Sequence, residues 1–216
     1  MSYPGDITTG LVGWWKLDDG SGTSAADSIG TNTGTLLGAT LPTWNGSGKI
    51  GTNSLNFGGV GYVNVGSAAP LDPIAVSMAA WVRPSSFPNA YNTIVSAASG
   101  TGYHQLLVKS TGKLACYVFG SLSVSYDGTG INTLSTGTWY HIVLTYDSVT
   151  GLNCYVNGIL DGSAAANGTL VATAAATAIG TDLNTAGRQW NGDLDEVRIY
   201  NRVLTLADVT RLYNYT

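Results

Sequence analysis

The sequence consists largely of short segments in which apolar and polar residues alternate, and this pattern limits the fold more than any other feature. β-branched and aromatic residues are enriched in these segments, and Gly, Pro, Asn and Ser separate them. Side chains alternate between the two faces of a strand, so each segment is typical of a strand with one buried face. Strands are expected at residues 12–17, 54–57, 61–65, 74–83, 92–97, 103–109, 113–119, 121–126, 138–147, 152–160, 174–180 and 192–200. Many short strands joined by turns predict an all-β, two-sheet antiparallel sandwich.

Two local signals mark a turn and a helix. Asn157-Gly158 is a favoured pair for a tight hairpin turn, so a hairpin is expected there. Near the C-terminus, Thr205 is followed three residues later by Asp208, which predicts a capping box at the start of one short helix over residues 205–213. Its inward stripe is expected to consist of Leu206, Val209, Leu212 and Tyr213.

The strand predicted at residues 192–200 carries an acidic run. Strict alternation places Asp193 and Asp195 on the face that continues as core, and Glu196 on the opposite face with Arg198. A carboxylate beside a core face is unfavourable unless it is hydrogen-bonded, paired or bound to a metal, so Asp195 is a candidate functional residue. Glu196 is expected to form an exposed ion pair with Arg198, worth about 0 to 1 kcal/mol. Because Glu196 points away from both aspartates, the run does not supply the two facing carboxyl groups of retaining glycosidases.

Several longer motifs follow one another in a characteristic order. They are Gly-Trp-Trp-Lys-Leu-Asp-Asp at 13–19, Asp-Ser-Ile-Gly-Thr-Asn-Thr-Gly at 27–34, Trp-Val-Arg-Pro at 81–84, Trp-Tyr-His-Ile-Val-Leu-Thr-Tyr-Asp at 139–147 and Asp-Glu-Val-Arg-Ile-Tyr at 195–200. In this order they resemble the laminin-G-like jelly-roll domains, relatives of the concanavalin A-like lectins and the pentraxins. The resemblance extends from Gly13 to Tyr213 and implies a jelly-roll β-sandwich.

The resemblance also implies a calcium site, because the matching loop of the family meets the acidic last strand and binds Ca2+. Carried over to this sequence, Asp27 and Asn32 are side-chain ligands, Gly34 offers a carbonyl, and Asp195 completes the site, with Asp18 as a weaker candidate. Ca2+ prefers about six to eight oxygen ligands, and the loop is rich in oxygens. In the alternative interpretation, Asp27 and Asn32 only form turns with their own backbone, and Asp195 accepts backbone amides. A bound ion would be structural and would join the loop to the last strand.

Aromatic residues in or beside the predicted loops are candidate contacts for a sugar. Glycan sites combine aromatic faces with fixed polar groups, and exposed loops commonly carry such contacts. The candidates are Trp44, Tyr91, Tyr103, Tyr126 and Trp190. The alternative for each is packing in the core. Trp14, Trp81 and Trp139 lie within strand patterns and are expected to be core residues.

The composition excludes several classes of function. Only 10% of the residues are charged and 44% are hydrophobic, so solubility depends on Ser, Thr, Asn and Gly, which suits hydroxyl-rich partners or a packed assembly. With a net charge of -4 and scattered basic residues, nucleic-acid binding is not expected. No apolar run reaches the roughly 20 residues of a membrane span. No Ser or Cys nucleophile has a visible His partner, so a non-catalytic protein is expected.

The two cysteines leave an alternative open. Cys116 and Cys154 lie in similar strand contexts and can form a cross-strand disulfide if their strands are neighbours. The sequence favours the other interpretation, in which they are two small buried thiols.

A domain over residues 11–216 is expected to follow an N-terminal tail of residues 1–10. The first residues lack the basic start and apolar stretch of a secretory signal, although domains of the family it resembles are usually modules of secreted or surface proteins. We therefore expect an extracellular recognition or adhesion module that contacts a glycan or a surface protein. The alternative is a virion surface or phage decoration protein that forms a homo-oligomer or joins a capsid or tail lattice.

Overall fold

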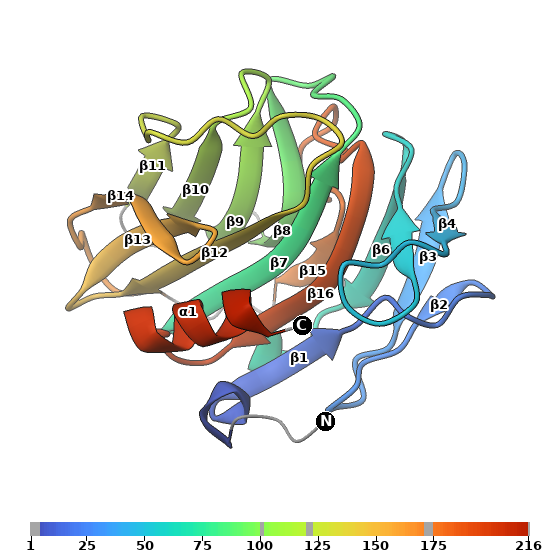
Figure 1. Cartoon of the computed structure of the whole chain (residues 1–216). Coiled ribbons are helices and arrows are strands. Elements are labelled where there is room, and N and C mark those ends of the chain that lie inside the picture. The colour runs from blue at the N-terminus through green and yellow to red at the C-terminus, as the bar shows by residue number, and fades with distance from the viewer. Residues whose placement is uncertain (1–4, 100–101, 120–122, 171–174, 216) are drawn as a thin grey trace.

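The computed structural model describes residues 5–99, 102–119, 123–170 and 175–215. Two eight-stranded sheets pack face to face, and one helix lies against the outer face of one of them (Figure 1). All strand pairings are antiparallel. The helix is α1, Leu206–Asn214, and short 3-10 helices lie at Gly5–Thr8 (η1) and Ala69–Leu71 (η2). The predicted all-β sandwich with a short C-terminal helix is confirmed.

The first sheet contains β1 (Leu11–Trp15), β4 (Thr43–Asn45), β5 (Ser54–Asn56), β7 (Val76–Pro84), β12 (Tyr140–Asp147), β13 (Gly151–Val156), β14 (Ile159–Ala164) and β16 (Gly192–Tyr200). Its order is β14-β13-β12-β7-β16-β5-β4, and β1 also pairs with β16. The strand β16 therefore has β7 on one side and both β1 and β5 on the other.

The second sheet contains β2 (Ser24–Ala25), β3 (Gly34–Gly38), β6 (Gly61–Gly66), β8 (Tyr91–Ser99), β9 (Gly102–Lys109), β10 (Leu114–Phe119), β11 (Ser123–Asp127) and β15 (Ala176–Ile179). Its order is β11-β10-β9-β8-β15-β6-β3-β2.

Each predicted strand overlaps a strand of the structure. The segment 152–160 forms β13 and β14, joined at Asn157 and Gly158, whose φ angles of 52° and 81° match the predicted tight turn. Residues 121–122 and 174 of the predicted strands, and residues 1–4 of the predicted tail, lie outside the described residues. Three of the described strands were not predicted: β2 and β4 have only two and three residues, and β3, Gly-Thr-Leu-Leu-Gly, lacks a run of β-branched residues.

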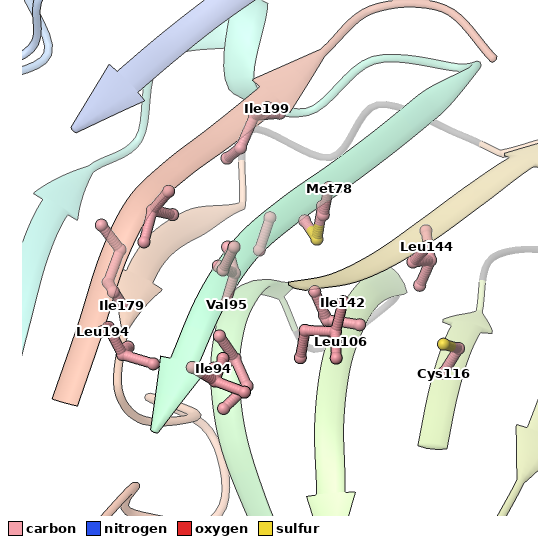
Figure 2. Packing of buried hydrophobic residues seen from close by; sticks show 14 of the residues in the cluster. Met78, Ile94, Val95, Leu106, Cys116, Ile142, Leu144, Ile179, Leu194 and Ile199 are labelled. Carbon is pink, nitrogen blue, oxygen red and sulfur yellow. The ribbon is translucent and has the colours of Figure 1, made fainter. Parts of the chain in front are cut away.

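The main hydrophobic core fills the space between the sheets. Met78, Ile142 and Leu144 from the first sheet meet Val95 and Leu106 from the second, all fully buried (Figure 2). These inward positions repeat every second residue along their strands, as expected from strand geometry. The core therefore requires both sheets.

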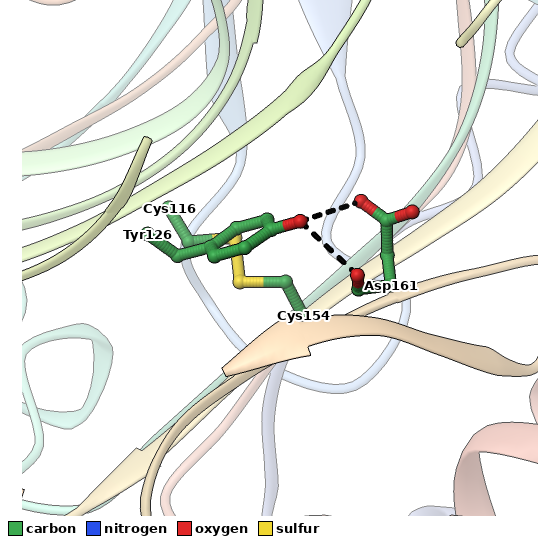
Figure 3. The surroundings of a disulfide bond; sticks show 4 residues. All are labelled: Cys116, Tyr126, Cys154 and Asp161. Carbon is green, nitrogen blue, oxygen red and sulfur yellow. Dashed lines mark hydrogen bonds between the residues drawn. A yellow bond between two sulfur atoms is a disulfide. The ribbon is translucent and has the colours of Figure 1, made fainter. Parts of the chain in front are cut away.

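A disulfide bond crosses this core. Cys116 on β10 and Cys154 on β13 are linked, with Cα atoms 6.8 Å apart (Figure 3). The strands are not neighbours in one sheet, because they face each other from opposite sheets. The interpretation of two free thiols is thus wrong: alternation points both side chains inward, and the sequence could not show that the two sheets bring them together.

The outer face of the first sheet is covered by a second hydrophobic cluster. Val209 and Leu212 of α1 pack with Tyr200 and with Ile7 of η1. The Tyr200 hydroxyl donates to the Ile7 carbonyl at 2.9 Å. Residues 5–8, which were predicted as part of a tail, therefore pack onto the domain.

The helix begins at the predicted capping box. The Asp208 amide donates to Thr205 Oγ1 at 3.2 Å, and the Thr205 amide donates to Asp208 Oδ2 at 3.0 Å. The predicted inward stripe is wrong for Leu206, whose exposed fraction is 57%. The buried face contains Asp208, Val209 and Leu212. Asp208 forms an ion pair there, with Arg202 Nη1 2.8 Å from its Oδ2. Leu206 consequently lies to one side of the contact.

A β-bulge in β16 changes which residues of the acidic run face the core. The register with β7 shifts between Asp195 and Arg198, and Glu196 has a left-handed φ of 54°. Leu194 therefore joins Val197 in the main core. Asp195 pairs with Trp81, which is not in that core, so the predicted common face of Asp195 and Val197 is wrong.

Candidate functional site

A row of four aromatic side chains lies on the outer face of the second sheet. It consists of Tyr91 on β8, Tyr103 on β9, and Tyr117 and Phe119 on β10, and is called here the aromatic row. Successive ring centroids are 4.3 Å apart for Tyr103 and Phe119, 5.9 Å for Phe119 and Tyr117, and 5.6 Å for Tyr117 and Tyr91. All four rings are partly exposed. They face outward because the alternating positions of the same strands fill the core.

A polar pocket of about 220 Å³ adjoins Tyr103. Ala98, Gln105, Asp182, Asn184, Thr185 and Arg188 complete its lining. Arg188 Nη1 lies 3.1 Å from Gln105 Oε1 and 3.4 Å from Asp182 Oδ2. The Arg188 guanidinium also lies 5.3 Å from the centroid of the Tyr91 ring, within the range of a cation–π contact. The pocket therefore presents ordered hydrogen-bonding groups beside an aromatic surface.

A second ion pair lies beside the aromatic row. Lys109 Nζ is 3.1 Å from Asp127 Oδ2, and the Tyr117 and Tyr91 hydroxyls donate to Asp127 Oδ1 at 2.6 and 3.3 Å. Burial and the hydrogen bond to Asp127 raise the pKa of Tyr117 well above its ordinary value. Partial burial acts to raise the pKa of Asp127, but hydrogen bonds from Tyr117 and Lys109 outweigh it and lower that pKa. At neutral pH the phenol is therefore a donor and the carboxylate an acceptor.

Two of the predicted sugar contacts, Tyr91 and Tyr103, belong to the aromatic row. Trp44 lies elsewhere, on β4 of the first sheet, where its Nε1 donates to the Gly22 carbonyl at 2.9 Å. It is partly buried against the core.

The prediction of a ligand contact is wrong for Tyr126 and Trp190, because both belong to the hydrophobic core. Tyr126 is 5% exposed, and its hydroxyl donates to the Asp161 carboxylate at 3.1 Å (Figure 3). Trp190 is fully buried and packs edge-on against Phe87, with ring centroids 6.4 Å apart. Their positions beside predicted loops did not reveal this burial.

Sequence reasoning missed Tyr117 and Phe119 of the aromatic row, and Gln105, Asp182 and Arg188 of the pocket. Strict alternation over residues 113–119 separates Tyr117 and Phe119 from the inward Cys116, so the signal for two of them was present. Arg188 lies in the loop before β16, and nothing in its local sequence indicates its contacts.

The three tryptophans expected in the core have different positions. Trp14 and Trp81 are buried, at 4% and 3% exposure. Trp139 is only partly buried, and the Arg83 guanidinium lies 4.9 Å from its ring centroid. The core prediction is wrong for Trp139, because this residue precedes β12 and lies outside the sheet.

The loop predicted to bind calcium is closed by hydrogen bonds to Asp27. Its Oδ1 accepts from the Trp14 amide at 3.0 Å and from the Ile29 amide at 3.2 Å. Its Oδ2 accepts from the Asn32 amide at 3.2 Å and from Asn32 Nδ2 at 3.1 Å. Gly34 is the first residue of β3. Asp27 thus has the turn-forming contacts of the alternative interpretation.

Asp195 binds a different segment. Its Oδ2 accepts from the Lys49 and Ile50 amides at 2.7 and 2.9 Å, and the side chain is fully buried. Burial raises its pKa to about 7, although those amides act in the opposite direction. Asp18 likewise accepts amides of this segment, from Thr52 at 2.9 Å and Asn53 at 2.6 Å. Among the described residues no three His, Cys, Asp or Glu side chains gather to hold a metal ion, and the calcium site stays a prediction.

The predicted exposed pair of Glu196 and Arg198 is wrong, because both side chains are buried, at 3% and 1% exposure. Arg198 Nη2 and Trp14 Nε1 both donate to Glu196 Oε2, the latter at 2.8 Å. Burial raises the pKa of Glu196, while the charge of Arg198 lowers it. The left-handed bulge at Glu196 and the packing of α1 remove this pair from solvent.

Comparison with known proteins supports the architecture. The family model of the concanavalin A-like lectin/glucanases superfamily matches residues 57–210. No curated protein matches the chain. No helix in the described part of the chain is long and apolar enough to span a bilayer.

Three solved structures illustrate the similarity. Domain 4 of AbnA, a GH43 extracellular arabinanase from Geobacillus stearothermophilus solved with arabinotriose, is 23% identical, with a TM-score of 0.78 over 94% of this chain and 98% of that one. The binding domain of botulinum neurotoxin serotype D is 17% identical, with a TM-score of 0.70 over 99% of this chain and 52% of that one. A sialidase mutant from Trypanosoma rangeli is 19% identical, with a TM-score of 0.67 over 95% of this chain and 33% of that one. This chain thus spans about a third of the sialidase and half of the neurotoxin domain.

The family match covers more than half of the chain, and the order of strands in both sheets agrees with a jelly roll. The protein belongs to the concanavalin A-like lectin/glucanases superfamily.

Proposed function

We propose that this protein is a non-catalytic carbohydrate-binding domain that holds a glycan against the aromatic row. The observation that carries the proposal is the continuous, partly exposed row of four rings next to the polar pocket at Arg188. A sugar ring has an apolar C–H face that packs on an aromatic ring, and hydroxyls that need fixed polar partners at its edge. The aromatic row supplies the first, and Gln105, Asp182 and Arg188 supply the second.

Two similar structures support this proposal without deciding it. Domain 4 of the arabinanase was solved with arabinotriose, and cell entry of botulinum neurotoxin type C depends on interaction with two ganglioside molecules. Identities of 23% and 12% show that the fold is shared but do not identify the ligand. The experiment below identifies the glycan that this protein binds.

Binding without catalysis is consistent with the carboxylates at the site. Asp127 and Asp182 each form an ion pair with a basic side chain. Glycosidase chemistry needs one carboxyl group that stays protonated to act as an acid. The lowered pKa of Asp127 is the opposite of that requirement.

The test is affinity electrophoresis against a set of polysaccharides, followed by calorimetry with oligosaccharides of any that retard the protein. Tyr103→Ala should weaken binding at least tenfold, about 1.4 kcal/mol, because it removes the ring shared by the row and the pocket. Trp139→Ala removes a partly exposed ring from the segment just before β12 and is the matched control, expected to bind as the wild type does. Trp44→Ala tests the other predicted contact. Equal binding by wild type and Tyr103→Ala would contradict the site.

We also retain structural calcium binding as a proposal, supported by the oxygen-rich loop around Asp27 and by the resemblance to laminin-G-like domains. Added calcium should raise the melting temperature, and a chelator should lower it. Asp27→Asn should abolish the difference. An unchanged melting temperature in both conditions would leave the turn-forming role of Asp27 as its only role.

The role of a virion surface or decoration subunit is kept as the alternative proposal for where the domain acts. It requires a symmetric oligomer or a lattice, whereas an adhesion module is expected to be monomeric or linked to other domains. The native mass of the purified protein in solution distinguishes the two.

A further inference from the structure

We infer that the aromatic row and its pocket select neutral glycans over acidic ones. This inference rests on the proposed glycan binding and narrows it to a chemical class. The observation behind it is that Arg188 and Lys109, the two basic side chains that lie over the Tyr91 ring of the row, each already have a carboxylate partner.

The pocket contains the first of these pairs. Asp182 is almost completely buried, with 2% of its side chain exposed, and its carboxylate lies 3.4 Å from Arg188 Nη1. The same nitrogen lies 3.1 Å from Gln105 Oε1. A carboxylate ligand is bound most strongly by the two-pronged face of a free guanidinium. Here Arg188 Nη1 already donates to two protein acceptors, and the buried Asp182 carboxylate also accepts from the Asn184 amide at 2.9 Å.

The second pair neutralises Lys109, the other cation that lies over the Tyr91 ring. Lys109 Nζ lies 3.1 Å from Asp127 Oδ2, and Asp127 is held by the hydroxyls of Tyr91 and Tyr117. Lys113, in the turn between β9 and β10, donates to the carbonyls of Gly130 and Ile131 at 2.9 and 3.5 Å.

The other basic residues are distant from this surface. Of the nine in the sequence, six lie on the first sheet, on its adjoining loops or at the C-terminal helix: Lys16, Lys49, Arg83, Arg198, Arg202 and Arg211. An acidic sugar on the aromatic row would therefore meet Asp182 and Asp127, while Arg188 and Lys109, the cations that lie over a ring of the row, are already compensated.

A neutral sugar gains from the same arrangement. A hydroxyl group both donates and accepts, and the Arg188–Asp182 pair offers a donor and an acceptor side by side. A carboxylate only accepts, so it would leave Asp182 facing a like charge. Specificity of this kind depends on a repulsive element as well as on an attractive one. Asp182 is that element.

The experiment compares glycans of both classes on the wild-type protein. Neutral polysaccharides (arabinan, galactan, mannan and β-glucan) and acidic ones (polygalacturonate, alginate and hyaluronan) are tested by affinity electrophoresis and then by calorimetry, at low and at physiological salt. We expect the best neutral ligand to bind at least tenfold more tightly than any acidic one. Asp182→Asn keeps the side-chain shape and frees the Arg188 charge. It should raise affinity for acidic glycans at least tenfold, in a salt-sensitive manner, and weaken neutral binding.

Asp19→Asn is the control for net charge, because it removes one negative charge from an exposed loop and should leave the preference unchanged. Wild-type binding of acidic glycans as tightly as neutral ones would overturn the inference and leave the proposed function standing. A folded Asp182→Asn variant with unchanged preference would also overturn it. If this variant does not fold, as judged by thermal melting, the wild-type comparison alone decides. Binding of neither class would overturn the proposed function, and the inference with it.

Discussion

At the residue scale, Glu196 joins distant parts of the chain. Its carboxylate accepts from Trp14 in β1 and from Arg198 in β16, and the Arg198 guanidinium lies 4.8 Å from the Trp14 ring centroid and 5.3 Å from that of Tyr215. Arg198 Nε and Nη1 are buried without a hydrogen-bond partner. The Arg198 charge therefore depends on Glu196 for its compensation.

Replacing Glu196 with Gln should consequently destabilise the protein by about 3 to 5 kcal/mol, because it leaves a buried and unpaired guanidinium. The free energy of unfolding in urea measures the effect. The double variant Glu196→Gln with Arg198→Met should recover part of the loss, since no buried charge is then left alone. A single variant as stable as the wild type would show that solvent reaches this pair.

At the scale of elements, one local contact starts the helix and one covalent bond joins the two sheets. The capping box begins α1 over the first sheet, and the Cys116–Cys154 disulfide joins β10 to β13 across the core. The capping box acts within four residues of the chain, whereas the disulfide connects strands of opposite sheets.

Thr205→Ala should destabilise the protein by about 1 kcal/mol, the usual effect of losing a helix N-cap. Thr205→Ser keeps the accepting oxygen and should restore most of the difference, whereas loss of a methyl contact alone would make the two variants equal. Thermal melting followed by circular dichroism compares them.

Reduction of the disulfide should destabilise the protein by about 4 kcal/mol, because the bond closes a loop of 38 residues in the unfolded chain. Urea unfolding with and without dithiothreitol measures this difference. The double variant Cys116→Ala with Cys154→Ala should be insensitive to reductant. An equal response of this variant and the wild type would contradict the assignment.

At the scale of the whole molecule, stability depends on ionisable groups buried by the packing of the layers. Burial, with the charge of Arg198 in support, lowers the pKa of His141 to about 3. The ordinary pKa of an unfolded histidine is about 6.5, so below that pH the unfolded chain binds a proton that the folded chain does not. Above pH 6.5 His141 is neutral in both the folded and the unfolded chain and does not change the free energy of unfolding. As the pH falls from 6.5 towards about 3, the protein loses stability because only the unfolded chain binds the proton.

Asp195 acts in the opposite direction. Its folded pKa of about 7 is above the unfolded value, so the folded chain gains stability on proton binding as the pH falls through 7. The pH dependence of wild-type stability is therefore the sum of two opposing contributions, from His141 and from Asp195. His141→Gln should isolate the histidine: relative to the wild type, the variant should gain up to about 1.4 kcal/mol for each pH unit below 6.5. Urea unfolding at pH 8, 6 and 5 measures this, and a constant difference would contradict the burial of neutral His141.

Much of the fold could be predicted from the sequence because the signals are local. Alternation with period two, the Asn157-Gly158 turn and the Thr205–Asp208 box act within a few residues, and the structure contains each of them. The candidate site was less predictable, and only Tyr91 and Tyr103 among the proposed sugar contacts lie in the aromatic row. The rings of Tyr91 and Tyr117 meet because β8 and β10 flank β9, an order that no local pattern contains.

The sequence by itself determined most of the segments that are strands and which faces of most strands are apolar, since both follow from the period of the side chains. The tertiary structure decided how those faces are used. The bulge at Glu196 reverses the phase of β16, so that Leu194 enters the core and Asp195 leaves it. The packing of α1 and of the opposite sheet then buries Glu196, Arg198 and Cys116, while the outer face of β8, β9 and β10 keeps its rings partly exposed. Register, strand order and layer packing depend on contacts between residues far apart in the chain, and for that reason only the folded structure specifies them.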